Sequence, residues 1–269
     1  MAGGSASVLV VRPRAQALAW VAELQALGVA ASALPLIDIV PAPEPARVAE
    51  VFAALEAAHG AAQARRPLLV FVSPNAVRGF FTATASARGV APSSLAWPAA
   101  AWAGATGPGT VAALREAGVP ESAIVAPPAT ATQFDSEALW ARIAGWPWSA
   151  RPAWLVRGNG GRDWLGQQLR DAGAEVRVVQ SYGRTAPVLD DPERALLAAA
   201  LAEPGRWIWM FSSSEAIDHL AALAPGAQWH ASRALASHPR IAERAVALGF
   251  GVVDTIAPLP AAVVAALRG

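Results

Sequence analysis

Apolar runs alternate with amphipathic stretches along the whole chain. The run "VLVVRP" (8–13) is followed by a stretch in which apolar residues recur at helical spacing from Leu18 to Leu27, and Gly28 stands where that helix should stop. A second extended segment, "ASALPLIDIVP" (31–41), comes next. The pattern predicts a strand, a helix and a strand, which is the repeating unit of parallel α/β sheets.

The same order of elements returns in the second half of the chain. At one constant offset, residues 154–187 match the first segment, with Arg157 at the position of Arg12 and Gly173 at the position of Gly28. Three further pairs match in the same order: 68–81 with 207–220, 101–119 with 233–250, and "AIVAPP" with "GVVDTIAP". Two copies of one strand and helix series predict two similar α/β domains, each with a parallel sheet.

Two long connections stand at equivalent places in the copies. Residues 34–45 and 180–193 are punctuated by proline and partly extended, which is typical of segments that pass from one domain to the other. With two such crossings, the first strand and helix pack with the last third of the chain. The alternative is two sequential domains that divide near residues 145–152. The repeat is compatible with both arrangements.

Composition narrows the class of protein. The net charge of +1 argues against a broad nucleic-acid-binding face, and the absence of cysteine excludes disulfides, thiolate metal sites and cysteine nucleophiles. No apolar run is long enough for a membrane span, and residues 1–13 lack the features of a signal peptide, so we expect a cytoplasmic enzyme. All 21 basic residues are arginine. A GC-rich genome accounts for that choice, but it also means that a bound carboxylate would meet a guanidinium group.

The glycine-rich turn in "VRGNGGRDWL" (156–165) does not match a nucleotide-binding loop. Asp163 stands where a dinucleotide fingerprint needs its third glycine, and no acidic residue ends the next strand. The turn "GATGPGT" (104–110) also has the wrong spacing and lacks the lysine of a P-loop. Both turns leave backbone N–H groups at a helix N-terminus, which is a generic site for anions.

Polar residues gather where the predicted strands end, the edge at which open α/β sheets bind ligands. The candidate binding residues at these turns are Arg12, Ser73, Asn75, Thr110, Arg157, Gly158, Asn159, Gly160, Gly161, Ser212, Ser213 and Ser237. Helix capping alone would explain each serine and threonine, and both arginines could be ordinary surface residues. The equivalence of Arg12 and Arg157 in the two copies favours a role in binding.

Other catalytic chemistry finds little support in the sequence. The histidines His59, His219, His230 and His238 are scattered without a second ligand at helical spacing, so we expect no metal site. There is no G-x-S-x-G motif for a serine nucleophile. Tyr182, the single tyrosine, lies in the second connection, where two crossings would place it facing the gap between domains. The alternative is a packed linker aromatic with a solvated hydroxyl.

The motifs in their order resemble the uroporphyrinogen-III synthase family. The resemblance covers nearly the whole chain and rests on "VLVVRP", "FVSPNAV", "GATGPGTVAALREAGV", "VRGNGGRDWL", "YGRTAP" and "ALASHPRIAERAVALGF". It implies two Rossmann-like, flavodoxin-like parallel-sheet domains joined by a two-stranded linker, with the substrate in a cleft between them. The expected domains are residues 1–36 with 188–269 and residues 44–180, and the expected linkers are residues 37–43 and 181–187.

The resemblance also implies the reaction. The substrate would be hydroxymethylbilane, a linear tetrapyrrole with many carboxylates, which loses its hydroxyl and closes through a spiro intermediate with ring D inverted. Tyr182 would assist the departure of the hydroxyl, and no cofactor would take part. Ile241 stands where the family carries the threonine of a G-P-x-T turn, so that role is carried over to Thr110 alone.

The implied partners are few. We expect a monomer that takes the bilane from the preceding deaminase of the pathway and binds neither nucleic acid nor membrane. A cytosolic two-lobed protein that binds a small molecule without catalysis would show a similar repeat, although such binders have larger lobes. A two-domain glycosyltransferase is a third possibility, but no nucleotide site accompanies it.

Overall fold

The strands of the described residues form two five-stranded parallel sheets and one two-stranded sheet. The computed structural model describes residues 6–58, 65–128, 130–131 and 133–268. The chain divides into unit 1, Met1–Asp38 with Thr185–Gly269, and unit 2, Ile39–Arg184. Two parallel-sheet α/β domains confirm the predicted fold class. Within the described residues, no helix is both long and apolar enough to cross a membrane.

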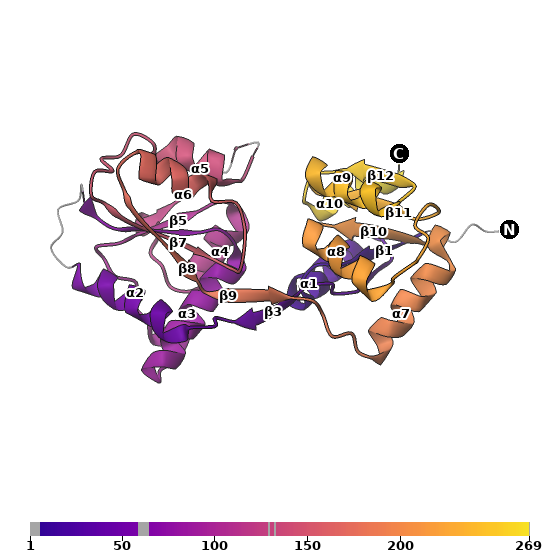
Figure 1. The fold of residues 1–269 in the computed structure, drawn as a ribbon, viewed down its shortest axis with the longest axis horizontal. Coiled ribbons are helices and arrows are strands. Elements are labelled where there is room, and N and C mark those ends of the chain that lie inside the picture. The colour runs from indigo at the N-terminus through magenta and orange to yellow at the C-terminus, as the bar shows by residue number, and fades with distance from the viewer. Residues whose placement is uncertain (1–5, 59–64, 129, 132, 269) are drawn as a thin grey trace. The chain divides into compact units, whose positions relative to one another are not determined.

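Unit 2 has helices on both faces of its sheet. The strand order is β6-β5-β4-β7-β8, and all neighbouring strands are parallel. Helices α2, α3 and α4 cover one face, and α5 and α6 cover the other (Figure 1). Its elements are α2 (Pro45–Ala57), β4 (Leu68–Phe71), α3 (Pro74–Arg88), η2 (Pro92–Ser94), β5 (Trp102–Ala105), α4 (Pro108–Glu116), η3 (Glu121–Ala123), β6 (Ile124–Val125), α5 (Ser136–Ile143), β7 (Pro152–Arg157), α6 (Trp164–Asp171) and β8 (Glu175–Gln180).

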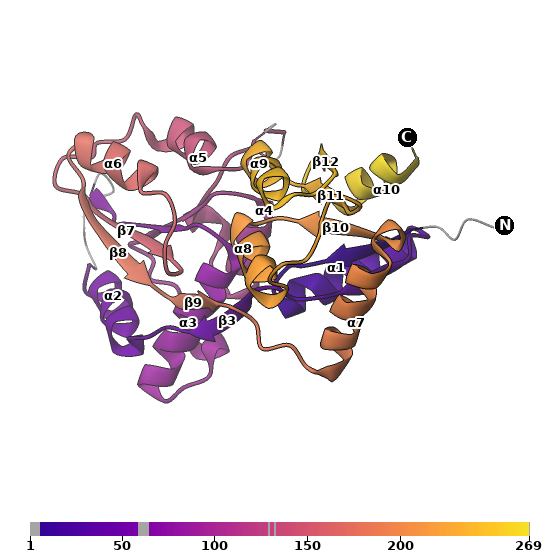
Figure 2. The same ribbon diagram turned by 45° about the vertical axis from the view of Figure 1, so that its right-hand side comes forward.

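Unit 1 has the same architecture. The order β12-β11-β10-β1-β2 is flavodoxin-like when the strands are counted along the chain. Helices α7, α8 and α9 pack on one face, and α1 and α10 on the other (Figure 1 and Figure 2). Its elements are β1 (Ser7–Val10), α1 (Arg14–Ala26), β2 (Ala31–Ala33), α7 (Asp191–Ala202), η4 (Pro204–Arg206), β10 (Trp207–Phe211), α8 (Ser214–Leu223), β11 (Arg233–Ala236), α9 (Pro239–Leu248), β12 (Val252–Thr255) and α10 (Pro260–Arg268).

The internal repeat maps onto the two sheets. Strand β1 pairs with β10 in unit 1, and the equivalent strand β7 pairs with β4 in unit 2. Because β1 pairs with a strand from the last third of the chain, the chain has the crossed arrangement and not the sequential one. The central strands "LLVF" and "WIWMF" are continuous apolar runs, as expected for parallel strands that are buried on both faces.

The segment 31–41, which we predicted as one strand, forms two. Strand β2 ends at Ala33, and β3 (Asp38–Pro41) begins after a break that contains Pro35. Proline has no N–H to donate to a neighbouring strand, so the ladder of unit 1 ends near this position. Strand β3 then pairs with β9 (Tyr182–Thr185), and the predicted linkers contain these two strands.

Glycines permit close contacts around the β3–β9 pair, both with α3 and between the two strands. A Cβ added at Gly79 in α3 would lie 2.2 Å from the carbonyl oxygen of Ser181, the residue before β9. A Cβ added at Gly183 would lie 2.6 Å from Cγ2 of Val40 in β3. Both contacts are too short for a side chain, so the close approach requires glycine.

We predict that Gly79→Ala destabilises the protein. Alanine normally stabilises a helix relative to glycine by about 1 kcal/mol, but here the methyl group would force α3 and the start of β9 apart. We expect a net loss of about 1–3 kcal/mol in the free energy of unfolding, measured by denaturant titration. Gly205→Ala is the matched control, since no atom lies within 4 Å of its added Cβ. Equal stability of the two variants would contradict the prediction.

Candidate functional site

Tyr182 is the first residue of β9 and is closely packed in the core of unit 2. The residue is 6% exposed and belongs to the core on the α2–α4 face of the sheet. The phenol oxygen lies 3.2 Å from Oγ of Ser73. The ring packs directly on the backbone after β7, because a Cβ added at Gly158 would lie 2.7 Å from the ring carbon Cζ. The tyrosine is therefore packed, as in the alternative interpretation, but its hydroxyl is hydrogen-bonded to Ser73.

Ser181, the residue before Tyr182, is hydrogen-bonded to two elements of unit 2. Ser181 is fully buried, and its hydroxyl donates to the carbonyl oxygen of Ala76 in α3 at 2.9 Å. Its backbone N–H donates to the carbonyl oxygen of Arg157 at the end of β7, also at 2.9 Å. The start of β9 is thus tied to both a helix and a strand of unit 2.

The predicted residues at the ends of β4 and β5 lie on neighbouring strands. Ser73 caps α3 by accepting a hydrogen bond from the N–H of Ala76 at 3.1 Å, and Asn75 lies in the first turn of this helix. Thr110 is buried in the first turn of α4. Thr106 donates to the carbonyl oxygen of Val72 at 3.3 Å and links the ends of the two strands.

The glycine-rich turn after β7 has a structural purpose. Gly160 and Gly161 have φ values of +78° and +116°, a region that disfavours other residues. The side chain of Asn159 accepts from the N–H of Arg184 at 2.6 Å and donates to its carbonyl oxygen at 2.9 Å. The side chain of Arg157 donates to the carbonyl oxygen of Gly161 at 3.4 Å. The turn therefore binds strand β9 through Asn159.

The helix that follows this turn is a poor place for an anion. Asp163 occupies the N-cap position of α6, and its carboxylate pairs with Arg170 at 2.8 Å. A carboxylate at a helix N-terminus already interacts with the positive end of the helix dipole and repels a second anion. Burial of the Tyr182 ring against Gly158 is thus a better account of the glycine there than phosphate binding.

Arg12 in unit 1 carries a charge that is partly withdrawn from solvent. It directly follows β1, and its guanidinium group lies over the ring of Trp20, 4.2 Å from the centroid. Its Nε is buried and makes no hydrogen bond with any described residue. Burial lowers the pKa of Arg12 to about 10, so the group is still a cation at neutral pH. A cation held in this way is suited to an anionic ligand.

Three further predicted residues follow β10 and β11, which lie in the same sheet as β1. Ser212 and Ser213 come after β10, and Ser213 caps α8 by accepting from the N–H of Glu215 at 3.2 Å. Ser237 comes after β11, where its N–H donates to the carbonyl oxygen of Phe211 at 3.0 Å. Since β11, β10 and β1 are adjacent and parallel, these residues and Arg12 share one edge of the sheet. Ile241, at the atypical turn, is buried in the core under α9.

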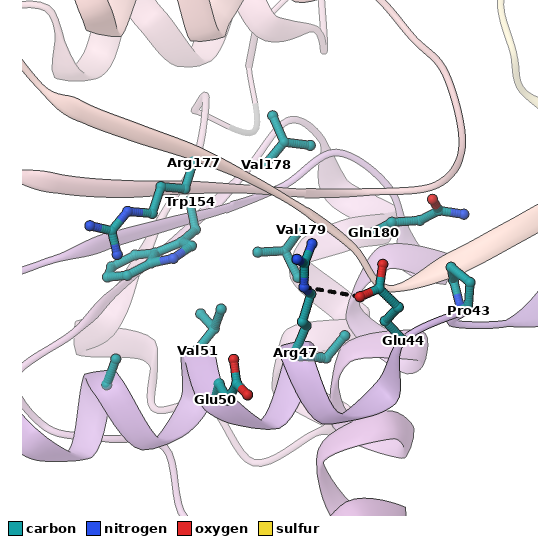
Figure 3. Close-up of a pocket in the computed structure, with 12 residues that line it drawn as sticks. Pro43, Glu44, Arg47, Glu50, Val51, Trp154, Arg177, Val178, Val179 and Gln180 are labelled. Carbon is teal, nitrogen blue, oxygen red and sulfur yellow. Dashed lines mark ion pairs between the residues drawn. The ribbon is translucent and has the colours of Figure 1, made fainter.

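A pocket of about 420 Å³ lies elsewhere in unit 2, between α2 and strands β7 and β8 (Figure 3). Trp154, Val51 and Val179 supply apolar walls, and charges of both signs stand around them. Nε of Arg47 pairs with Glu44 at 2.9 Å. None of the predicted site residues lines this pocket. Its balanced charges offer no preference for an anionic ligand.

Sequence reasoning missed the residues that support Tyr182. Ser181 and Gly79 were not among the candidates, because contacts between α3 and β9 join residues about a hundred positions apart. Arg184 was also missed, and the equivalence of the two copies could not have revealed its bond with Asn159.

For metals, the described residues contain no cluster of three or more ligands, and His59 lies outside the described residues.

Comparisons with known proteins point in one direction. Residues 19–261 match the family described as HEM4, uroporphyrinogen-III synthase HemD. The fold is similar to that of a mutant uroporphyrinogen III synthase from the extremely thermophilic bacterium Thermus thermophilus, with 21% identity, 98% of each chain covered and a TM-score of 0.58. It is also similar to uroporphyrinogen-III synthetase from Helicobacter pylori, with 13% identity, 98% of this chain and 99% of that chain covered, and a TM-score of 0.56. No curated protein matches the chain in sequence.

We predict that two neighbouring arginines affect stability with opposite signs. Arg12→Met removes a half-buried cation whose pKa is lowered by desolvation, so the free energy of unfolding at pH 7 should equal or exceed that of the wild type despite the lost contact with Trp20. Arg14→Met removes the partner of the buried Glu193, whose carboxylate lies 2.8 Å away, and should cost about 1–3 kcal/mol. Denaturant titration of both variants tests this, and a larger loss for Arg12→Met would contradict it.

The pH dependence has a defined sign. Because burial lowers the pKa of Arg12 to about 10 in the folded state, the unfolded chain binds more protons at pH values above that point. The cost of burying the cation is therefore fully present below pH 10 and falls as the pH rises further. The comparison at pH 7 measures the full cost.

Proposed function

The chain belongs to the uroporphyrinogen-III synthase family, and from this membership we propose that it converts hydroxymethylbilane into uroporphyrinogen III. The match over residues 19–261 is the observation that carries the proposal. In classification terms, the enzyme is then a lyase, because the net reaction eliminates water and closes a ring. The tetrapyrrole is its only substrate in this proposal.

The reaction makes modest demands on catalytic groups. The bilane also cyclises unaided, but it then gives the isomer without inversion of ring D. The enzyme must therefore hold the conformer from which the substituted carbon of ring D attacks and stabilise the charge that develops. Hydroxyl groups, backbone amides and arginines at strand ends are sufficient for these tasks.

Tyr182 is the group that we propose assists departure of the hydroxyl. The carbon–oxygen bond breaks with both electrons on the oxygen, the phenol transfers its proton to that oxygen, and water leaves. A proton is released again when the closed ring system regains its aromatic pyrroles, so the phenol is restored. The fixed ring and the hydrogen bond to Ser73 support this role, because a catalytic donor needs a defined direction.

Arg12 is the group of unit 1 that we propose binds a substrate carboxylate. Its guanidinium group is a half-buried cation, and its buried Nε has no hydrogen-bond partner among the described residues. A charge-assisted hydrogen bond contributes about 1.5–3 kcal/mol. The remaining polar strand-end residues, Asn75, Thr110, Arg157, Ser212, Ser213 and Ser237, stay candidates for further carboxylates.

We also propose where the enzyme works. It acts in the cytoplasm as a monomer and receives the bilane directly from the preceding deaminase, because a substrate that cyclises unaided should spend little time in solution. The chemistry needs no cofactor.

The isomer of the product tests the proposed function. Purified protein is added to freshly prepared hydroxymethylbilane, the product is oxidised, and the uroporphyrin isomers are separated by chromatography. We expect the type III isomer to dominate. Type I alone, formed at the rate without protein, would refute the synthase activity and favour a two-lobed binding protein.

Tyr182→Phe tests the catalytic role. Loss of the hydroxyl should lower kcat by about 100-fold, the scale of one general acid, whereas affinity for uroporphyrinogen III should change little. Steady-state kinetics and fluorescence titration with product measure the two quantities. The ring of phenylalanine keeps the packing on Gly158, so the variant should fold. Unchanged turnover would remove Tyr182 from the mechanism.

A further inference from the structure

Ser73 makes two hydrogen-bond contacts with its hydroxyl group. Its Oγ accepts from the N–H of Ala76 at 3.1 Å and lies 3.2 Å from the phenol oxygen of Tyr182. A serine hydroxyl carries one hydrogen and two lone pairs. Since Ala76 uses one lone pair, the hydrogen and the second lone pair are left for Tyr182.

The helix favours one of the two possible directions for the second contact. Helix α3 spans 15 residues, and Ser73 stands at its N-terminus, which has a partial positive charge. An O–H bond next to this charge is most stable when its oxygen faces the helix and its hydrogen points away. Among the described residues, the phenol oxygen of Tyr182 is the acceptor that the structure provides for that hydrogen.

We propose that Ser73 is a positioning residue that donates its hydrogen to Tyr182 and thereby directs the phenol proton away from α3, toward the substrate. The inference rests on the proposed function, in which Tyr182 assists departure of the hydroxyl. It replaces the sequence-based hypothesis that Ser73 binds substrate directly.

Three donors then point in one direction. The N–H of Ala76 donates to Ser73, Ser73 donates to Tyr182, and Tyr182 donates to the leaving hydroxyl. Hydrogen bonds in such a chain polarise one another, so the phenol becomes a stronger donor than an isolated tyrosine. When the phenol proton passes to the departing oxygen, the bond from Ser73 and the helix N-terminus stabilise the negative charge left on Tyr182.

The packing of the ring makes this orientation specific. The backbone of Gly158 lies against one part of the ring, and Ser181 is tied to Ala76 and Arg157. The ring is therefore fixed, and the remaining degree of freedom is rotation of the O–H bond of Tyr182. The hydrogen bond from Ser73 sets the direction of this O–H bond.

Three substitutions of Ser73 separate capping from donation. Ser73→Thr keeps both the cap and the hydroxyl hydrogen. Ser73→Ala removes both. Ser73→Asp keeps an acceptor for the cap, but its carboxylate cannot donate and instead accepts the phenol proton, which reverses the direction of the bond to Tyr182.

The single tyrosine of the chain offers a readout that needs no substrate. Protein labelled with ¹³C at Cζ of tyrosine gives one resonance, that of Tyr182. Donation of the phenol proton to a carboxylate should move this resonance downfield in Ser73→Asp, whereas Ser73→Thr should resemble the wild type. An Asp variant with the wild-type resonance would show that Tyr182 already donates to Ser73, which would overturn the proposal.

Kinetics give the second readout. We expect Ser73→Ala to lower kcat about tenfold, the equivalent of one hydrogen bond, with KM nearly unchanged. Ser73→Asp should lower kcat at least as much, although its helix is capped, and Ser73→Thr should regain most of the turnover that Ser73→Ala loses. A raised KM with normal kcat would instead indicate direct substrate binding and refute the positioning role.

Asp135→Ala is the control for the loss of a helix cap. Asp135 caps α5 in the same unit by accepting from the N–H of Ala138 at 2.8 Å. The variant should lose stability but keep the Tyr182 resonance and the turnover. If the wild type makes no type III isomer, the proposed function fails, whereas an unchanged resonance in Ser73→Asp refutes the inference about Ser73 in either case.

Discussion

The parallel pairing of β1 with β10 is the constraint on which the rest of the molecule depends. It joins Ser7 to Trp207 in one sheet, so the chain must leave unit 1 after β2 and return to it before α7. The outgoing and returning segments pair as β3 and β9. Tyr182 is the first residue of β9, and its position is therefore a consequence of the same topology.

Close backbone contacts at the start of β9 explain several glycines that look functional in the sequence. Gly79 admits the carbonyl group of Ser181, and Gly158 admits the ring of Tyr182. Small residues are needed because a helix, a strand end and the linker meet within van der Waals distance. The glycine cluster after β7 thus serves the tyrosine and the linker. It does not form a phosphate-binding loop.

The polar residues at strand ends fall into two groups, those whose side chains already have hydrogen-bond partners in the protein and those whose side chains do not. Asn159 uses both ends of its amide on the backbone of Arg184, and Ser213 caps its helix, so each has a structural partner. Arg12 differs, because its Nε is buried without a hydrogen bond to any described residue and its pKa is lowered by burial. Groups whose bonds are already satisfied add little to ligand binding, whereas an incompletely satisfied cation gains from a carboxylate.

Periodicity and repetition in the sequence determined the fold class and the equivalence of the two copies, because apolar patterning and turn residues act locally. The same local rules placed Ser73, Ser213 and Asn159 at strand ends. Only the tertiary structure decided what their side chains do, since the partners of Ser73 and Asn159 include Tyr182 and Arg184, far away in the chain. The choice between crossed and sequential domains was decided in the same way, by the pairing of β1 with β10. The partner of a strand can come from a distant part of the chain, and no local pattern records it.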